Sequence, residues 1–200
     1  MSDLPYTMTT ETLTAAGRSV AFTRVAEPDD VLDVAARENH VEPPYWATIW
    51  PSGRALAAWA GQHVKHGQRV LDLGCGSGIV GCAALLAGAR VTLADWEPAA
   101  LELARANAEA AGGEFDVRRV DWHTDTLPGR YDLILAADVM YEPAMGAAVL
   151  DFCQRHVGEG GQIVLADPNR RHADAVAALV HTTGGTLLPF PGGRILVLQA

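Results

Sequence analysis

The chain has 200 residues, of which 49% are hydrophobic and 20% are charged, and its formal net charge is −9. This length and apolar content suit one folded domain and argue against a disordered chain. The acidic balance argues against a protein that grips a nucleic-acid backbone, because phosphate binding needs clustered lysine and arginine.

The cysteines and the apolar segments indicate in which cellular compartment the protein is expected. Cys75, Cys82 and Cys153 are odd in number and show no CxxC spacing, which favours reduced thiols and a cytoplasmic location over a disulfide framework. We expect no signal peptide and no membrane span, since no run approaches about 18 apolar residues. The seven histidines show no metal-ligand spacing with cysteines or acids, so we expect no metal site. The sequence leaves the oligomeric state open.

The first part of the chain, residues 1–45, is predicted to be an N-terminal hairpin and lid extension. Apolar residues alternate loosely over Thr12–Arg24 around a turn signal at Ala16-Gly17, which predicts a small hairpin. Pro28 can start a short helix that runs through Ala36, and Pro43-Pro44 breaks whatever precedes it.

Predicted strands and helices alternate from Trp50 to the C-terminus, and the main domain is predicted over residues 46–200. This order is typical of βαβ units, and the last two strands are joined by so short a turn that they must be antiparallel. We therefore predict an α/β, Rossmann-like fold with a seven-stranded, mostly parallel sheet, one antiparallel strand and helices on both faces. The predicted strands are 69–73, 90–94, 115–120, 131–136, 161–166, 186–190 and 194–198, and the predicted helices are 51–64, 79–87, 98–111, 143–156 and 171–182.

A glycine-rich loop follows the first strand of this sheet, in the sequence Val70–Gly78. Glycines let the backbone turn tightly and approach a ligand, and the carboxyl end of the first strand is the expected ligand crevice. The segment Gly76–Gly81 also fits GxGxxG, so this loop alone is compatible with a dinucleotide site, and hence an NAD-binding oxidoreductase, or with a generic strand-to-helix turn.

Two acids bear on that choice. Asp72 precedes the glycines, where a carboxylate would repel a pyrophosphate but favour a cationic sulfonium ligand. Asp95 ends the second strand, where it can accept hydrogen bonds from ribose hydroxyls of either kind of nucleoside. Asp72 therefore selects a sulfonium ligand, whereas Asp95 supports any nucleoside.

An acid and an aromatic residue, Asp121 and Trp122, follow the third strand. Asp121 can accept from an adenine amine, and Trp122 can stack on the base or wall its pocket. The competing interpretation is a solvated turn acid beside a tryptophan at the rim, and the sequence supports both equally.

With these residues assembled, the chain resembles the class I S-adenosylmethionine-dependent methyltransferases. VLDLGCGSG (Val70–Gly78) looks like their first motif and LADWEP (Leu93–Pro98) like their second. Within that group, Trp50-Pro51-Ser52-Gly53 and Asp138-Val139-Met140-Tyr141 resemble motifs of the family 16 lysine methyltransferases. Asp167–Arg170 is similar to the D-P-G-R of the bacterial branch related to the lysine methyltransferase of electron-transfer flavoprotein β-subunit, with Asn169 in place of the glycine.

The resemblance and the residues above together define a predicted site. It implies S-adenosylmethionine as the cofactor, with Asp138 and Tyr141 facing the methyl acceptor. The predicted cofactor-binding residues are Trp50, Asp72, Gly74, Cys75, Gly76, Gly78, Asp95, Trp96, Asp121, Trp122 and Ala137. Trp46, Trp50 and Trp59 can form an N-terminal lid that packs on the core, closes over the cofactor, or does both.

The acceptor is the open question. The leading hypothesis is a lysine amine of a protein substrate, and the alternative is a small-molecule N- or O-methyltransferase. We expect no nucleic-acid substrate, because Asp138–Tyr141 stands where amine methyltransferases of nucleic acids carry an N-P-P-Y-type motif. Asp138 can orient the incoming amine or can merely cap the following helix. We expect Cys75 to have a packing role, because no general base adjoins it in the sequence.

Overall fold

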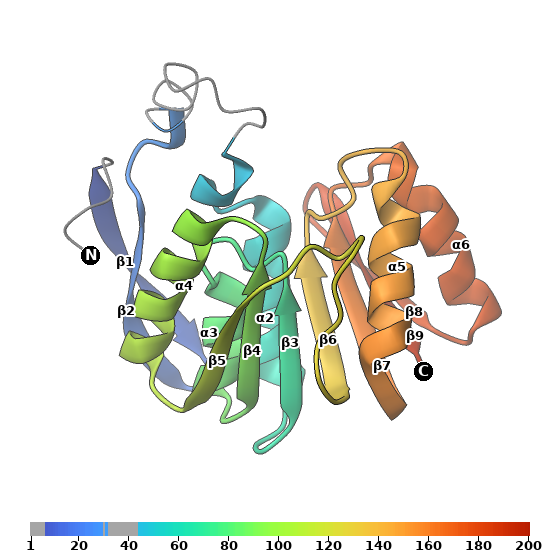
Figure 1. Cartoon of the computed structure of the whole chain (residues 1–200), viewed down its shortest axis with the longest axis horizontal. Helices are drawn as coiled ribbons and strands as arrows, with labels where there is room; N and C mark the ends of the chain where they lie inside the picture. Colours follow the sequence, from blue (N-terminus) through green and yellow to red (C-terminus); the bar gives the residue numbers. More distant parts are fainter. Residues whose placement is uncertain (1–6, 30, 32–43) are drawn as a thin grey trace.

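One mixed sheet of seven strands forms the centre of the computed structural model, which describes residues 7–29, 31 and 44–200 (Figure 1). The strand order is β5-β4-β3-β6-β7-β9-β8, and β9 runs antiparallel to both of its neighbours. The predicted fold class is therefore confirmed. The strands are β3 (Arg69–Leu73), β4 (Arg90–Asp95), β5 (Glu114–Arg119), β6 (Tyr131–Ala137), β7 (Val157–Asp167), β8 (Thr186–Phe190) and β9 (Gly193–Gln199).

Helices cover both faces of the sheet because successive strand residues point to opposite sides. In β3, Val70 belongs to the core beneath α2 (Pro51–His63), α3 (Ile79–Leu86) and α4 (Pro98–Ala111). The next residue, Leu71, belongs to the core beneath α5 (Met145–His156) and α6 (Asp174–Thr182). No helix in the described part of the chain is long and apolar enough to span a membrane.

The N-terminal hairpin consists of β1 (Met8–Ala15) and β2 (Arg18–Val25), as predicted, and lies beside α4 in Figure 1. Asn107 of α4 fixes it in place. The Asn107 amide donates to the carbonyls of Thr23 and Ser77, and its oxygen accepts from the Thr23 N–H. The hairpin is thereby connected to the glycine loop. The short helix predicted from Pro28 lies for the most part outside the described residues.

Three elements of the main domain begin more than one residue away from the predicted start. α6 begins at Asp174 and not at residue 171, because Arg171–Ala173 form the 3₁₀ helix η2. β7 begins at Val157 and not at residue 161, because Val157 pairs with Tyr131 across an irregularity in the ladder. Gly161 permits this close approach, since a Cβ there would lie 2.9 Å from the Gly158 carbonyl oxygen. α5 begins at Met145 and not at residue 143, because the chain first makes a turn in which the Met145 N–H donates to the Glu142 carbonyl.

The order of the strands places the ligand site. After β3 the chain builds β4 and β5 on one side of it, and β6 and the remaining strands on the other. Loops leaving β3 and β6 at their carboxyl ends therefore diverge, and this divergence creates a crevice in open α/β sheets. The short 3₁₀ helix η1 (Tyr45–Ala47) lies above the same edge of the sheet in Figure 1.

Gly78 gives a test of how the glycine loop packs. Its φ is +83°, and a Cβ there would lie 3.1 Å from the Cβ and 3.2 Å from the Cα of Ala104 in α4. Gly67 has a similar φ of +79° with nothing near its Cβ position. We predict that Gly67→Ala lowers the free energy of unfolding by about 1 kcal/mol, the cost of the left-handed backbone.

Gly78→Ala should cost about 1–3 kcal/mol more, because it adds a packing conflict with α4 to the same backbone cost. Urea denaturation of the two variants measures the difference. Equal losses for the two alanines would contradict the close packing of the loop on α4.

Candidate functional site

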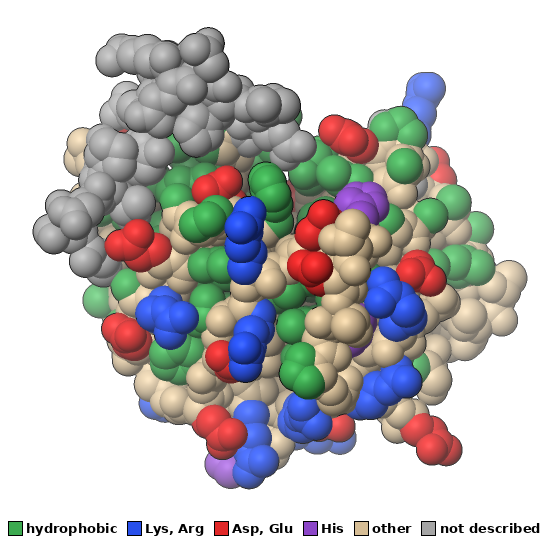
Figure 2. Space-filling model, in the orientation of Figure 1, with side chains coloured by type: hydrophobic (Ala, Val, Ile, Leu, Met, Phe, Trp, Pro, Cys, Tyr) green, Lys and Arg blue, Asp and Glu red, His purple; other side chains and the backbone are tan. Residues whose placement is uncertain are grey.

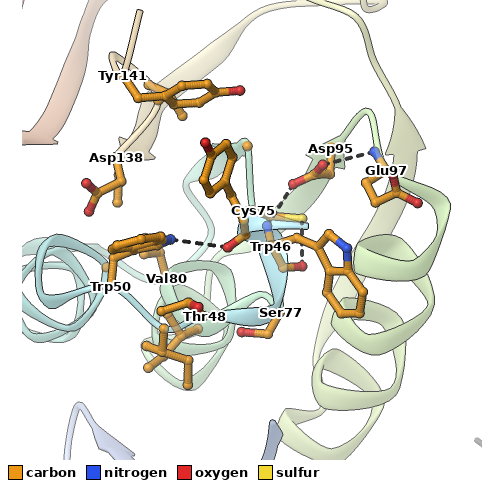
Figure 3. Close-up of a pocket in the computed structure, with 18 of the residues that line it drawn as sticks. Trp46, Thr48, Trp50, Cys75, Ser77, Val80, Asp95, Glu97, Asp138 and Tyr141 are labelled. Carbon is orange, nitrogen blue, oxygen red and sulfur yellow. Dashed lines mark hydrogen bonds between the residues drawn. The ribbon is translucent and has the colours of Figure 1, made fainter. Parts of the chain in front are cut away.

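A cavity of about 700 Å³ opens at the carboxyl ends of β3, β4 and β6, a size typical of small-ligand sites. Figure 3 shows Asp95 and Glu97 at one end of it, and Asp138 with Tyr141 at the other. The sequence-predicted residues that line it are Trp50, Asp72, Gly74, Cys75, Gly76, Asp95, Trp96, Trp122, Ala137, Asp138 and Tyr141.

The glycine loop forms the floor of the cavity. Both Gly74 and Cys75 donate their N–H groups to the Ala94 carbonyl at the end of β4, at 2.8 and 3.0 Å. Gly74 has a φ of +67°, and a Cβ there would lie 2.7 Å from a methyl carbon of Val139. Only glycine allows this approach. Burial raises the pKa of the Cys75 thiol well above its ordinary value, so the thiol stays protonated, in keeping with a packing role.

Asp72 holds the loop from below. It is buried, and its Oδ2 accepts the N–H of Gly81, in the first turn of α3, at 2.7 Å. Burial raises the pKa of Asp72 to about 7, although the hydrogen bond from Gly81 acts in the opposite direction. A cationic ligand in the cavity would favour the ionised form of this carboxyl group.

Asp95 holds the loop from the neighbouring strand. Its Oδ2 accepts the Gly76 N–H at 2.8 Å and its Oδ1 accepts the Glu97 N–H at 3.0 Å (Figure 3). Burial raises the pKa of Asp95, and these backbone hydrogen bonds oppose the shift. Each carboxylate oxygen has lone pairs beyond the one that the backbone uses, so Asp95 can still accept from a ligand.

Two tryptophans flank this end of the cavity. Trp96 is half exposed, and the Arg119 guanidinium lies 5.0 Å from its ring centroid. Arg119 also donates to the Trp96 carbonyl, which fixes the orientation of the pair. Trp122 lines the cavity, and its indole Nε1 is buried with no hydrogen-bond partner among the described residues.

Two predicted cofactor-binding residues do not line the cavity. Gly78 faces α4, as described above. Asp121 accepts the His123 N–H at 2.9 Å, and its own N–H donates to the Asp125 carboxylate. Asp121 thus has the geometry of a turn acid, and its contact with an adenine stays a prediction.

Asp138 follows β6 with a φ of +60°, unusual for a residue other than glycine. Its Oδ1 accepts from the Arg170 guanidinium at 2.6 Å, while its Oδ2 is buried with no hydrogen-bond partner among the described residues. The first residue before α5 is Ala144, and no side chain caps this helix. The capping interpretation of Asp138 is therefore wrong.

The segment around residues 44–50 closes the cavity on one side. The Trp50 indole donates to the Tyr45 carbonyl at 3.2 Å, and the rings of Tyr45 and Tyr141 lie 5.3 Å apart (Figure 3). Trp46 also lines the cavity, whereas Trp59 is buried in the core of α2. Packing on the core thus describes Trp59, and closure of Trp46 and Trp50 over a cofactor stays a prediction.

Sequence reasoning missed several residues of the cavity wall. Arg170 ends the Asp167–Arg170 motif and is not among the predicted site residues, although an arginine shortly after a strand end is a usable signal. Tyr45, Glu97 and Glu142 adjoin predicted residues in sequence and line the cavity as well. In the described part of the chain, no three His, Cys, Asp or Glu side chains gather in a way that could hold a metal ion.

Residues 30–177 match the family model described as lysine methyltransferase. The chain belongs to the lysine methyltransferase family. This match confirms the predicted resemblance. Membership of this family favours the methyltransferase interpretation of the glycine loop over the oxidoreductase alternative.

Individual relatives extend the comparison. The electron transfer flavoprotein beta subunit lysine methyltransferase of Xenopus laevis is 33% identical over 146 residues, covering 69% of this chain and 58% of the frog protein. The ubiquinone biosynthesis O-methyltransferase of Azotobacter vinelandii is 34% identical over 125 residues, covering 61% of this chain and 54% of that protein. The chain therefore spans little more than half the length of these relatives.

Solved structures agree on the fold. The 16S rRNA N2 G1207 methyltransferase of Thermus thermophilus, solved in complex with AdoMet and guanosine, matches with a TM-score of 0.72 at 16% sequence identity. The match covers 98% of this chain and 51% of that one. At this identity the likeness establishes the Rossmann-like methyltransferase fold alone.

The raised pKa of Asp72 predicts a pH dependence of stability. An unfolded aspartate titrates near ~3.9, so between about pH 4 and 7 the folded protein binds more protons than the unfolded chain. Asp72 therefore lowers the free energy of unfolding as pH rises through this window, by roughly 4 kcal/mol at most.

Asp72→Asn removes this dependence, so the melting temperature of the variant minus that of the wild type should increase from pH 5 to pH 8. Calorimetric melting at each pH measures it, with Asp116→Asn on exposed β5 as the control. A constant difference across the pH range would contradict the shifted titration.

Proposed function

We propose that the chain is an S-adenosylmethionine-dependent methyltransferase whose acceptor is a lysine amine of a protein. The observation that carries the proposal is the Asp138 carboxylate at the far end of the cavity from Asp95. It is buried, lines the cavity and keeps one oxygen without a partner among the described residues. A buried carboxylate oxygen of this kind favours a ligand that donates hydrogen bonds, as an amine does.

The cofactor end of the cavity fits an S-adenosyl nucleoside. Asp95 would accept from the ribose hydroxyls, because one of its oxygens accepts the Gly76 N–H, the other accepts the Glu97 N–H, and both keep spare lone pairs. Gly74 and Gly76, both with positive φ, allow a ligand to lie against the backbone. Trp122 offers a ring for an adenine. When bound, S-adenosylmethionine supplies an electrophilic methyl group on a sulfonium.

The residues at the acceptor end would orient the amine and exclude water. Methyl transfer needs an in-line approach by a neutral amine, so positioning can supply much of the catalysis. Asp138 would accept a hydrogen bond from the amine through its Oδ2. The rings of Tyr45, Trp50 and Tyr141 line the same cavity and would keep water away from it.

A protein substrate is supported by family membership and by the name of the frog relative. The surface supports it too: on the face in Figure 2, Lys and Arg side chains are interspersed with Asp and Glu and form no continuous basic stripe for a nucleic acid. The O-methyltransferase name of the second relative keeps the small-molecule alternative as an outcome of the test. The three buried, free cysteines support our proposal of a cytoplasmic location.

Transfer of label from a methyl-labelled donor in a cell lysate tests the acceptor. We expect a labelled protein band whose acid hydrolysate contains methylated lysine. Label that appears only in the small-molecule fraction would contradict the lysine proposal and favour a small-molecule methyltransferase.

Two substitutions should separate the two ends of the cavity. Asp138→Ala should leave the affinity for S-adenosylhomocysteine within about twofold and lower methyl transfer by about 100-fold, because it removes orientation of the acceptor alone. Asp95→Ala should lower the affinity for S-adenosylhomocysteine by more than about tenfold, because a charged hydrogen-bond acceptor is lost. Calorimetry and the labelling assay measure the two effects.

Asp151→Ala provides the control, since Asp151 forms an exposed ion pair with Arg155 on α5. It should change neither quantity. Loss of cofactor binding in Asp138→Ala would show that Asp138 belongs to the cofactor end.

A further inference from the structure

A turn at the end of β7 brings a guanidinium to the acceptor end of the cavity. Arg170 lies on the cavity wall, and its Nη1 donates to Asp138 Oδ1 at 2.6 Å. The same Nη1 lies 3.6 Å from Asp167 Oδ2, and both carboxylates are far more buried than the arginine. One positive charge therefore lies between two buried negative charges.

Hydrogen bonds to the backbone of this turn fix the position of Arg170. The Arg170 N–H donates to Asp167 Oδ1 at 2.7 Å, and the Arg194 guanidinium reaches the Arg170 carbonyl at 3.4 Å. Asn169 has a φ of +62°, a conformation that asparagine tolerates better than most residues other than glycine. This explains why asparagine can stand where the related motif has glycine.

The ion pair divides the two oxygens of Asp138 between two tasks. Oδ1 is occupied by Arg170, which fixes the rotamer of the carboxylate, and Oδ2 has no partner among the described residues. Without Arg170, a buried negative charge beside a lysine would favour the ammonium form, which cannot attack a methyl group. With Arg170, the carboxylate remains a hydrogen-bond acceptor while much of its field is cancelled.

Several other charged and titratable groups surround this position. Asp138 and Asp167 contact Arg170 directly, Arg194 contacts its carbonyl, and Asp174 of α6 pairs with Arg194 at 2.8 Å. The remaining titratable groups on the cavity wall are Tyr45, Asp72, Cys75, Asp95, Glu97, Tyr141 and Glu142. Among the described residues that line the cavity, Arg170 is the one Lys or Arg side chain.

We propose that Arg170 is a positioning residue that holds Asp138 by Oδ1, so that Oδ2 is left for the acceptor amine, and that it supplies a fixed positive charge favouring the neutral form of that amine. This rests on the proposed function, since it concerns the amine that the cavity would receive. Arg170 thus lets one carboxylate orient the amine without retaining its proton.

The pH dependence of kcat tests the proposal, because kcat reports how groups titrate in the enzyme–substrate complex. The acceptor, at saturating concentration, is the protein labelled in the lysate assay. For the wild type, the rate rises with pH as the acceptor amine loses its proton. Arg170→Gln should shift this rise upward by about one pH unit, because the amine then faces an uncompensated carboxylate. Arg170→Lys should restore the position of the rise, because it restores the charge.

Asp167→Asn is a second variant, for which we expect the pH profile to shift in the opposite direction from that of Arg170→Gln. It removes a negative charge 3.6 Å from the Arg170 guanidinium and should move the rise to lower pH. Arg118→Gln, in an exposed ion pair on β5, is the control and should leave the profile unchanged. Calorimetry with S-adenosylhomocysteine should give an affinity within about twofold of the wild type for each variant.

The outcomes separate this inference from the function on which it rests. A wild-type protein that labels no protein would overturn the proposed function itself. Where the wild type labels a protein, an Arg170→Gln profile that is lower at every pH but unshifted would reduce Arg170 to a structural ion pair and overturn the inference alone. An upward shift of the rise in Asp167→Asn would overturn the inference in the same way.

Discussion

Two carboxylates, the buried Asp72 and the half-buried Asp95, hold the glycine loop by backbone N–H groups, and the rest of the site depends on them. Asp72, on β3, accepts from Gly81, and Asp95, at the end of β4, accepts from Gly76. Since β3 and β4 are paired in parallel register, both acids arrive at the same edge of the sheet. The loop can therefore stay open to a ligand, because two short side chains at the cavity wall fix its backbone.

The two ends of the cavity differ in how their acids are satisfied. At the cofactor end, both oxygens of Asp95 accept from backbone N–H groups, which belong to the fold and do not move with a substrate. At the acceptor end, one oxygen of Asp138 accepts from the Arg170 guanidinium, and the other has no hydrogen-bond partner among the described residues. This difference suits one ligand held by a rigid loop and another received by a side-chain network.

Much of the fold could be predicted from the sequence because local and long-range signals agree. Pro98 begins α4 and glycine ends it, and β3 is buried without a break from Val70 to Leu73, as expected of a central strand covered on both faces. The start of β7 could not be predicted, because Gly158, Gly160 and Gly161 look like a loop. Only the pairing of Val157 with Tyr131 shows that the strand extends through them.

The site was predictable where motifs lie on strand ends and less so where it depends on contacts between distant segments. Asp95 and Asp138 both line the cavity because each lies at the carboxyl end of a parallel strand. The Asp138–Arg170 pair joins residues 32 positions apart, and no spacing rule predicts it. The sequence predicts Gly78 as a cofactor-binding residue of the glycine loop, but its close approach to Ala104 places it against α4.

Both ends of the cavity have a function only if the loop between Asp72 and Gly81 holds an S-adenosyl nucleoside. Isothermal titration of the whole chain with S-adenosylhomocysteine and, separately, with NAD tests this most directly. We predict one-to-one binding of S-adenosylhomocysteine in the micromolar range, that is about −8 kcal/mol, and no heat with NAD. Binding of NAD without binding of S-adenosylhomocysteine would contradict it.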